Sequence, residues 1–306
     1  KHPWAGTQFV QVEGPYRVRR EDRQAGIVEF EITFAVTGAP ILPGIVSGVA
    51  ALVTGLASSA VTSLFSAFSS KFGGASGGVS ATRLADGIAT VATVLDARTG
   101  SASDAASKLI TRAGQIVRDP AYGVPFFVEA FRAPFDDDTL GNPTLVSAFK
   151  EAHAAAQSVS LEADAILPTT ADLIRRKKDM AVLGATLEAA SFASLADAMA
   201  GRTYLTGDDV DADEALLADV FGQVQSRELD QDTHAEMTKI YTATSEVLRD
   251  VAVRLPRLSQ IDIQSMPASV LAYHLYESDA DLMTLVSLNL DKDPILFAGS
   301  TSVLVS

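Results

Sequence analysis

The sequence NLDKDPILFAGSTSVLVS (residues 289–306) decides the fold class of this chain. Asn289 is a residue type that often closes a helix, and Pro294 and Gly299 are typical of a loop. The run TSVLV that follows is short, apolar and β-branched, which favours a strand. A helix therefore leads through a turn-rich loop into a final strand.

The residues upstream complete this pattern. QIDIQ (260–264) alternates apolar and polar residues, as a half-buried strand does. A first helix follows with Pro267 in its first turn, and a second begins at Ser278 or Asp279, both good N-cap residues. Residues 257–306 therefore predict a compact βααβ module whose two strands pair.

Residues 81–256 have a residue pattern that is typical of helices. The most regular, near residues 232–254, carries a single apolar stripe, which predicts helix packing. Its members are Met237, Ile240, Tyr241, Thr244, Val247, Val251 and Leu255. Further helices are expected near 144–163, 170–200 and 212–227, while four prolines and four phenylalanines in 120–143 predict an irregular crossing. The pattern leaves open whether these helices form a bundle or an extended arm.

Residues 41–80 form a third region. No charged residue lies between Glu31 and Lys71, and the stretch ends in the flexible linker GGASGGVS (73–80). Two interpretations follow: a membrane span, or a helix of small residues buried against other helices. Many serines and threonines dilute its hydrophobicity, and its flanks carry no aromatic belt, so the second interpretation is favoured.

Residues 1–40 predict β structure. The segment 27–37, IVEFEITFAVT, alternates strictly and predicts a strand, and a second β-like run lies before it, so we expect a β-hairpin. Because the sequence opens on Lys1 without Met, we expect these strands to be the end of a truncated N-terminal domain. The predicted fold class is α+β and mostly α.

Composition and motifs argue against several functions. The net charge of −14 disfavours coating of DNA, and the absence of cysteine excludes disulfides and thiolate metal sites. No phosphate-binding loop, nucleophile elbow or dinucleotide fingerprint appears, and the scattered histidines lack metalloprotease spacing. These are His2, His153, His234 and His274. We therefore expect no enzyme activity, no cofactor and no metal.

Two charged segments are weaker candidates for binding. GDDVDADEA (207–215) spaces Asp209, Asp211 and Asp213 like a calcium loop, but Glu214 and Val220 stand where an EF-hand has Gly and Glu. We expect an acidic loop that leads into the next helix. Basic residues gather at RRKK (175–178) and in the first strands, where the possible phosphate contacts are Arg17, Arg19 and Arg20.

The C-terminal segment resembles the LysM module. That module also runs from a second helix through a conspicuous Asn and a Pro-containing loop to a Gly and a last strand. The matching residues are Leu282, Leu285, Leu288, Asn289, Pro294, Gly299, Val303 and Val305. Gln264, Ser265 and Met266 stand where most wall-binding modules have Gly-Asp, which argues against glycan binding.

Both ends of the chain are similar to the DNA circularisation protein family of Mu-like phages. At the start, the His-Pro-Trp-x-Gly turn and the aromatic strand residues match: His2, Pro3, Trp4, Gly6, Tyr16, Val18, Gly26, Phe30, Thr33 and Phe34. At the end, the match is carried by Pro267, Ala268, Val270, Leu271, Ala272, Tyr273, Leu275, Tyr276, Asn289, Pro294 and Phe297. His274 and Asp293 depart from the family, which favours Arg and His there.

This resemblance implies a structural component of a contractile phage tail baseplate, located in the virion. Its expected partners are other baseplate and tail proteins, and several copies per assembly are expected. The family name also implies a part in making injected DNA circular. Two alternatives stay open: direct binding of DNA ends, and engagement of the cell envelope through peptidoglycan or membrane contact.

Overall fold

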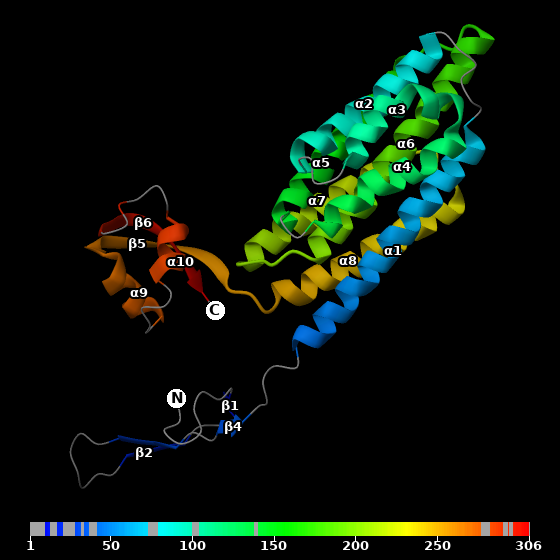
Figure 1. Cartoon of the computed structure of the whole chain (residues 1–306). Helices are drawn as coiled ribbons and strands as arrows, with labels where there is room; N and C mark the ends of the chain where they lie inside the picture. The colour runs from blue at the N-terminus through cyan, green and yellow to red at the C-terminus, as the bar shows by residue number, and fades with distance from the viewer. Residues whose placement is uncertain are drawn as a thin grey trace. The chain divides into compact units, whose positions relative to one another are not determined.

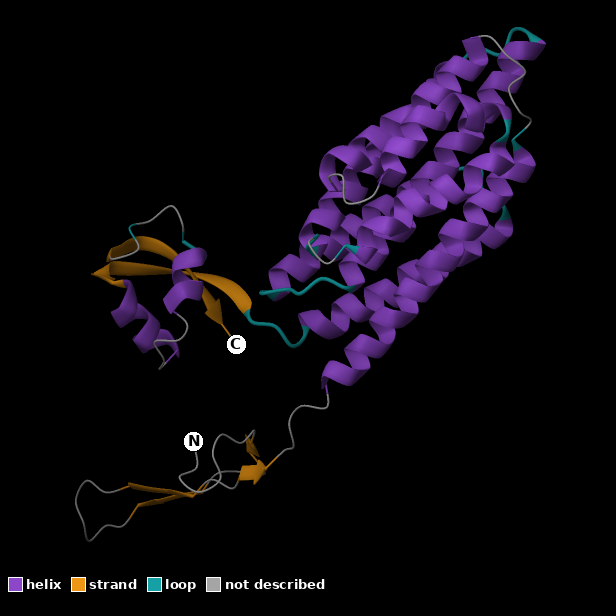
Figure 2. Ribbon diagram, viewed as in Figure 1, coloured by secondary structure: helices purple, strands orange, loops and turns teal. Residues whose placement is uncertain are grey.

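The computed structural model divides the chain into two compact units, Lys1–Gly48 and Val49–Ser306, and each is described by itself. The fold is mostly helical with short antiparallel sheets, which confirms the α+β, mostly α class (Figure 2). The structure describes residues 10–12, 17–20, 28–31, 34–36, 42–72, 79–99, 104–137, 140–276, 282–289, 293 and 296–305.

The first unit contains four short strands in two antiparallel pairs. β1 (Val10–Val12) pairs with β4 (Phe34–Val36), and β2 (Arg17–Arg20) pairs with β3 (Val28–Glu31). The single strand predicted over residues 27–37 is therefore two strands with different partners. The alternating pattern could not reveal this, because alternation reports the faces of a strand and not its neighbours.

The second unit begins with a helical bundle, which answers the question of bundle or arm (Figure 1). Helix α1 (Leu42–Lys71) belongs to this unit from Val49 on. The elements that follow are α2 (Val79–Thr99), α3 (Asp104–Arg118), α4 (Pro120–Arg132), the 3-10 turn η2 (Ala133–Asp136), α5 (Asn142–Ala165), α6 (Ala171–Ala200), α7 (Gly207–Gln225) and α8 (Gln231–Ala252). Val79 and Ser80 belong to α2 and not to the predicted linker.

Helix α6 is the centre of the bundle. Every residue from Leu183 to Ala200 is buried, although a surface helix buries only one face. The sequence permits this because most of these residues are small, so neighbouring helices approach closely. At Gly184 a Cβ atom would lie 2.3 Å from Ser160 Oγ and 2.9 Å from the Ser160 backbone nitrogen on α5. Glycine is required there by the contact between the two helices.

Aromatic side chains fasten α1 and α4 to this core. Phe65 stacks on Phe127 with 4.4 Å between the ring centroids, and Phe131 stacks on Phe149 of α5. Within the expected irregular crossing at 120–143, Pro120–Arg132 form a regular helix, which corrects the prediction there, while the 3-10 turn Ala133–Asp136 agrees with it. Pro125 removes only one backbone hydrogen bond from α4, and the buried rings on the next turns hold the helix in place.

The uncharged helix α1 packs on one face only. Val61, Phe65 and Phe68 are buried in the bundle core. Among the described residues, Val49–Lys71 is the one segment long and apolar enough to cross a bilayer, and 33% of its most apolar window is buried. Four hydroxyls near its end donate to the helix's own carbonyls, from Thr62, Ser66, Ser69 and Ser70.

Helices α7 and α8 close the bundle. The Thr206 hydroxyl caps α7 by accepting from the Asp209 amide, so α7 begins at Gly207 and not near residue 212 as predicted. The acidic segment is thus the first two turns of a helix, where negative charge is favourable, and not a loop. In α8, Met237, Ile240 and Thr244 are buried, which confirms that the predicted stripe is a packing surface.

The C-terminal module follows α8. β5 (Arg257–Pro267) and β6 (Leu296–Val305) form an antiparallel pair, with α9 (Ala268–Tyr276) and α10 (Leu282–Ser287) between them in sequence. Pro267 ends β5 instead of opening the helix, and β6 includes residues 296–299, which were predicted as loop. The register shifts once between Ile263 and Met266, so β5 contains an irregularity there.

Candidate functional site

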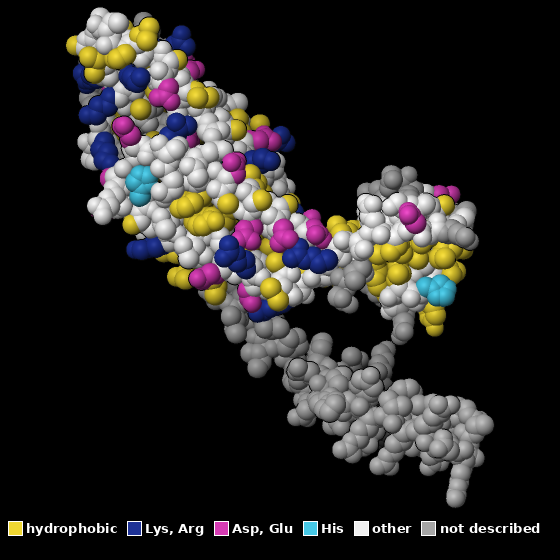
Figure 3. All heavy atoms as spheres, turned by 180° about the vertical axis from the view of Figure 1, so that it is seen from behind, with side chains coloured by type: hydrophobic (Ala, Val, Ile, Leu, Met, Phe, Trp, Pro, Cys, Tyr) yellow, Lys and Arg dark blue, Asp and Glu magenta, His cyan; other side chains and the backbone are white. Residues whose placement is uncertain are grey.

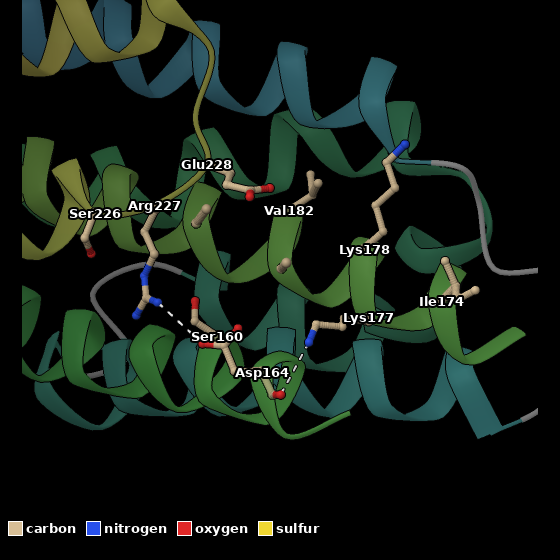
Figure 4. Close-up of a pocket in the computed structure, with 11 residues that line it drawn as sticks. Ser160, Asp164, Ile174, Lys177, Lys178, Val182, Ser226, Arg227 and Glu228 are labelled. Atoms are coloured by element: carbon tan, nitrogen blue, oxygen red, sulfur yellow. Dashed lines mark hydrogen bonds and ion pairs between the residues drawn. The ribbon is translucent and has the colours of Figure 1, made fainter. Parts of the chain in front are cut away.

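A cavity described by the structure lies beside α6 (Figure 4). It measures about 610 Å³ and is bordered by the end of α5, the first half of α6 and the turn between α7 and α8. Lys177, Lys178 and Arg227 contribute positive charge, and Asp164 and Glu228 contribute negative charge. Charged groups of both signs in a cavity of this size make it the first place to look for binding or chemistry.

The cations of this cavity mostly have structural partners. Arg227 Nε donates to Glu188 Oε2 at 2.9 Å, and its terminal nitrogen lies 4.0 Å from Asp164. Glu188 is fully buried on α6 and also accepts from the Ser160 hydroxyl. A buried carboxylate needs such partners, because an unpaired charge in the interior is strongly unfavourable. Arg227 and Glu188 therefore join α6 to the turn before α8.

The basic run 175–178 is also occupied with local contacts. Lys177 lies within 3.5 Å of two carbonyls at the end of α5, those of Asp164 and Ile166. Such carbonyls have no partner within their own helix, so a lysine there stabilises the helix end. Arg175 lies 3.9 Å from Asp179, one turn further on, and Lys178 extends away from the cluster (Figure 4). These contacts are typical of helix stabilisation.

The described histidines do not lie together in one site. His153 is buried between α6 and α7, where its Nδ1 lies 3.3 Å from the Glu188 carbonyl and its Nε2 lies 3.0 Å from Gln223 Oε1. His234 and His274 belong to α8 and α9, and His2 lies outside the described residues. In the part of the chain that the structure describes, no group of three metal-ligating side chains comes together.

The carboxylates of the predicted acidic segment are bound by the protein's own groups. Asp213 accepts from Arg202 at 2.7 Å and from the Tyr204 hydroxyl at 2.9 Å. Burial, and then the charge of Asp213, raise the pKa of Tyr204 well above its usual value. Asp208 and Asp211 both face Arg257. The arrangement uses these carboxylates to fasten α7 and does not present them to a calcium ion.

The same carboxylates attach the C-terminal module to the bundle. The Leu258 amide donates to Asp208 Oδ2 at 2.6 Å, and the Gly207 amide donates to the Pro256 carbonyl at 2.9 Å. Arg257 donates to Asp211, and this hydrogen bond raises the pKa of the guanidinium. The residues at the start of β5 are thus bonded to the first two turns of α7 at several points.

Within the module, the structure brings several of the predicted family residues together. Leu271 and Phe297 are buried in a core that is separate from that of the bundle, and Tyr276 packs against it. The Asn289 side chain is buried and makes three hydrogen bonds: it donates to the Leu285 and Ser302 carbonyls and accepts from the Ser302 amide, all at 2.8–2.9 Å. Asn289 therefore occupies the position that a neighbouring strand would have beside β6.

Other predicted residues lie outside this core. Tyr273 is 62% exposed and Leu275 is 37% exposed, and Val270 and Met283 are exposed as well. Hydrophobic side chains are visible on the surface of the module (Figure 3). Pro267 is exposed at the end of β5. His2, Pro3, Trp4, Gly6, Tyr16 and Pro294 fall outside the described residues, while Phe30 and Phe34 belong to β3 and β4.

The predicted phosphate contacts lie in β2. Register places Arg17 opposite Glu31 and Arg19 opposite Glu29, while Arg20 lies opposite Val28. Contact between these residues and phosphate stays a prediction.

Sequence reasoning missed the charged groups that matter most in the bundle. Glu188 and Asp197 are buried in an alanine-rich helix, and Asp197 accepts from Arg132 and from Thr54 at 2.6 Å each. The available signal was the presence of single carboxylates within a long run of small residues. Such residues require a cation from a neighbouring element, although the sequence does not say which one.

No protein-family model and no curated protein matches the chain.

Proposed function

We propose that this chain is a structural component of a contractile phage tail baseplate, which links neighbouring subunits through its terminal regions. The observation that carries the proposal is the junction between α7 and β5, where Arg257 faces Asp208 and Asp211. A folded module bonded at several points to a helical body suits a part whose task is to hold other parts in position.

The polar groups of the described cavity favour this function over catalysis. Arg227 and Lys177 are bound to Glu188 and to helix-end carbonyls, and so are already committed to the fold. A catalytic group needs access to substrate and a suitably poised protonation state. The bundle instead uses its buried charges to join helices, as a rigid spacer requires.

The C-terminal module is the better candidate for a docking element. Its βααβ order and its Asn289 support the LysM-like interpretation, and its apolar surface around Tyr273 is available for a partner. The acidic character of the chain suits partners with basic surfaces and keeps the free subunit soluble. The N-terminal strands are the proposed second attachment region.

Sedimentation of lysates from cells that produce contractile-tailed particles tests this function. Antibody against the chain is expected to detect it with intact particles, and to detect it with isolated baseplates after the tails are dissociated. Recovery only as the free subunit would refute the proposal.

A binding titration with linear duplex DNA distinguishes the assembly role from direct binding of DNA ends. If the chain bound DNA directly, its affinity would fall steeply as salt rises, since phosphate contacts release counterions. We expect no retention of duplex DNA at low salt, because the chain carries a net charge of −14.

A further inference from the structure

The two edges of the β5–β6 sheet differ in how their backbone groups are satisfied. On the β6 side, the Asn289 side chain bonds both the amide and the carbonyl of Ser302, and the Leu304 amide donates to the Tyr276 hydroxyl at 3.0 Å. These side chains take the place of a further strand. The outer edge of β6 is thereby closed to another chain.

The register shows which groups of β5 point outward. Ser302 lies opposite Gln260, and Leu304 lies opposite Leu258. In an antiparallel pair, residues whose amides point away from the partner strand lie opposite one another. Gln260 and, two residues on, Asp262 therefore direct their amides and carbonyls away from β6. The Leu258 amide follows the same rule, because it reaches Asp208 on α7.

Beyond Leu258 the outer edge of β5 has no such cover in the described residues. Gln260 and Asp262 are exposed, and no hydrogen bond from their outward backbone groups to another described element is found. Exposed strand edges are usually protected by charges, prolines or irregularities. On β5 an irregularity follows Ile263, Pro267 ends the strand, and Asp262 is the one charge beyond Leu258, so the part without proline or irregularity is short and lies between Leu258 and Ile263.

The face of the sheet that packs on the module core is also buried unequally, more on β6 than on β5. On β6, Phe297, Thr301 and Val303 are almost completely buried. On β5, Ile261 and Ile263 are only partly buried, although they face the same core. Among the described residues, the sheet thus leaves apolar surface uncovered on the side where the backbone groups of Gln260 and Asp262 have no partner, and one additional strand would satisfy both.

We propose that the outer edge of β5, from Gln260 to Ile263, binds an extended segment of a partner protein by strand addition. Backbone hydrogen bonds to Gln260 and Asp262 would align the segment, and two apolar side chains would cover Ile261 and Ile263. Between those apolar residues the segment carries a Lys or Arg opposite Asp262. The proposal deepens the assembly role, on which it depends for the class of partner.

The negative charge of this chain favours a different protein, and not a second copy of the chain, as the partner that adds a strand. Each copy has a net charge of −14, so two copies repel one another, and pairing of β5 with itself would bring two Asp262 residues into the same short ladder. A basic, apolar segment has the opposite character. At the start of this edge, Asp208 and Asp211 carry two negative charges against the single positive charge of Arg257.

Selection from a displayed library of short random peptides on the immobilised full chain tests the proposal. Enriched peptides are expected to contain Lys or Arg between two apolar residues. Addition of such a peptide should slow hydrogen exchange at the Gln260 and Asp262 amides of the unmodified protein and leave the Ser302 amide unchanged. This readout requires no variant and therefore does not depend on the folding of one.

Two substitutions then locate the site. Gln260→Pro removes one outward amide and should weaken peptide binding about tenfold or more. Asp262→Lys should change the selected charge from basic to acidic, whereas Glu246→Lys, the same charge change on an exposed position of α8, should not.

The proposal is overturned if no peptide is enriched, if enriched peptides bind Gln260→Pro equally well, or if the slowed amides lie elsewhere. Concentration-dependent dimers that Gln260→Pro abolishes would show that a second copy occupies the edge, which also overturns it. None of these outcomes bears on whether the chain resides in a particle, so failure here is distinct from failure of the proposed function.

Discussion

Replacing Asn289 with Asp should unfold the C-terminal module while the helical bundle persists. The substitution keeps an oxygen that can accept from the Ser302 amide, but it removes the amide nitrogen that donates to the Leu285 and Ser302 carbonyls. It also places a carboxylate against both carbonyl oxygens. The side chain is only 3% exposed, so water cannot replace the lost donors without opening the structure.

The size of the effect follows from these bonds. Each buried carbonyl left without a donor costs roughly 1–3 kcal/mol, so two cost about 2–6 kcal/mol. A module of this length has a total stability of roughly 2–7 kcal/mol, if it follows the usual value per residue. The loss is therefore comparable to the whole stability of the module, and local unfolding is the expected result.

Hydrogen exchange measured by mass spectrometry separates the module from the bundle. In Asn289→Asp, peptides from β6 and α9 should lose protection, while peptides from α6 should exchange as in the unmodified chain. Asn142→Asp is the matched control, because Asn142 makes one hydrogen bond, to the Gly201 carbonyl, at a more accessible position. Unchanged protection of β6 in Asn289→Asp would refute the reasoning that this side chain closes the edge.

Three further perturbations test the bundle. Gly184→Ala should destabilise the bundle by about 1–3 kcal/mol, because the added methyl group overpacks against α5. Gly114→Ala, whose methyl group would meet nothing within 4 Å, should stabilise α3 by roughly 0.5–1 kcal/mol. Urea unfolding that ranks the two variants in the opposite order would contradict the packing described. Arg227→Met leaves Glu188 without its cation and should cost about 3–5 kcal/mol in the same assay, and a loss below roughly 1 kcal/mol would show that the pair is not structural. A hydrogen bond from the lysine at the end of α1 lowers the pKa of Asp230, so its contribution to stability is complete above the unfolded pKa near ~4 and is lost as pH falls below it. The melting temperature of the unmodified chain should thus fall more steeply below about pH 4 than that of Asp230→Asn, and parallel curves would exclude this role.

The elements that could be predicted are those whose periodicity reflects burial on one face. The stripe through Met237 and Ile240 identified α8 because one side of that helix packs and the other is solvated. The alternation of Ile261 and Ile263 identified β5 for the same reason. Where one face of a helix or strand is buried and the other is solvated, the order of apolar and polar residues predicts that element.

Features that depend on a distant neighbour could not be predicted. From Leu183 to Ala200, helix α6 is buried on all sides, so this part of its sequence lacks a polar face, and nothing local indicates that Glu188 meets Arg227. The start of α7 was misplaced because its acidic first turns resemble a loop until Arg257 and the Thr206 cap are known. Asn289 was predicted as a motif residue that closes a helix, but its bonds to Ser302 could not be predicted, because Ser302 lies 13 residues further along the chain.

Electron cryomicroscopy of contractile-tailed particles that contain this chain tests the proposed assembly role most directly. We expect density for the helical bundle within the baseplate, with the C-terminal module and the N-terminal strands in contact with different subunits. Particles that lack this density, or a bundle with neither terminal region in contact with another subunit, would contradict the role.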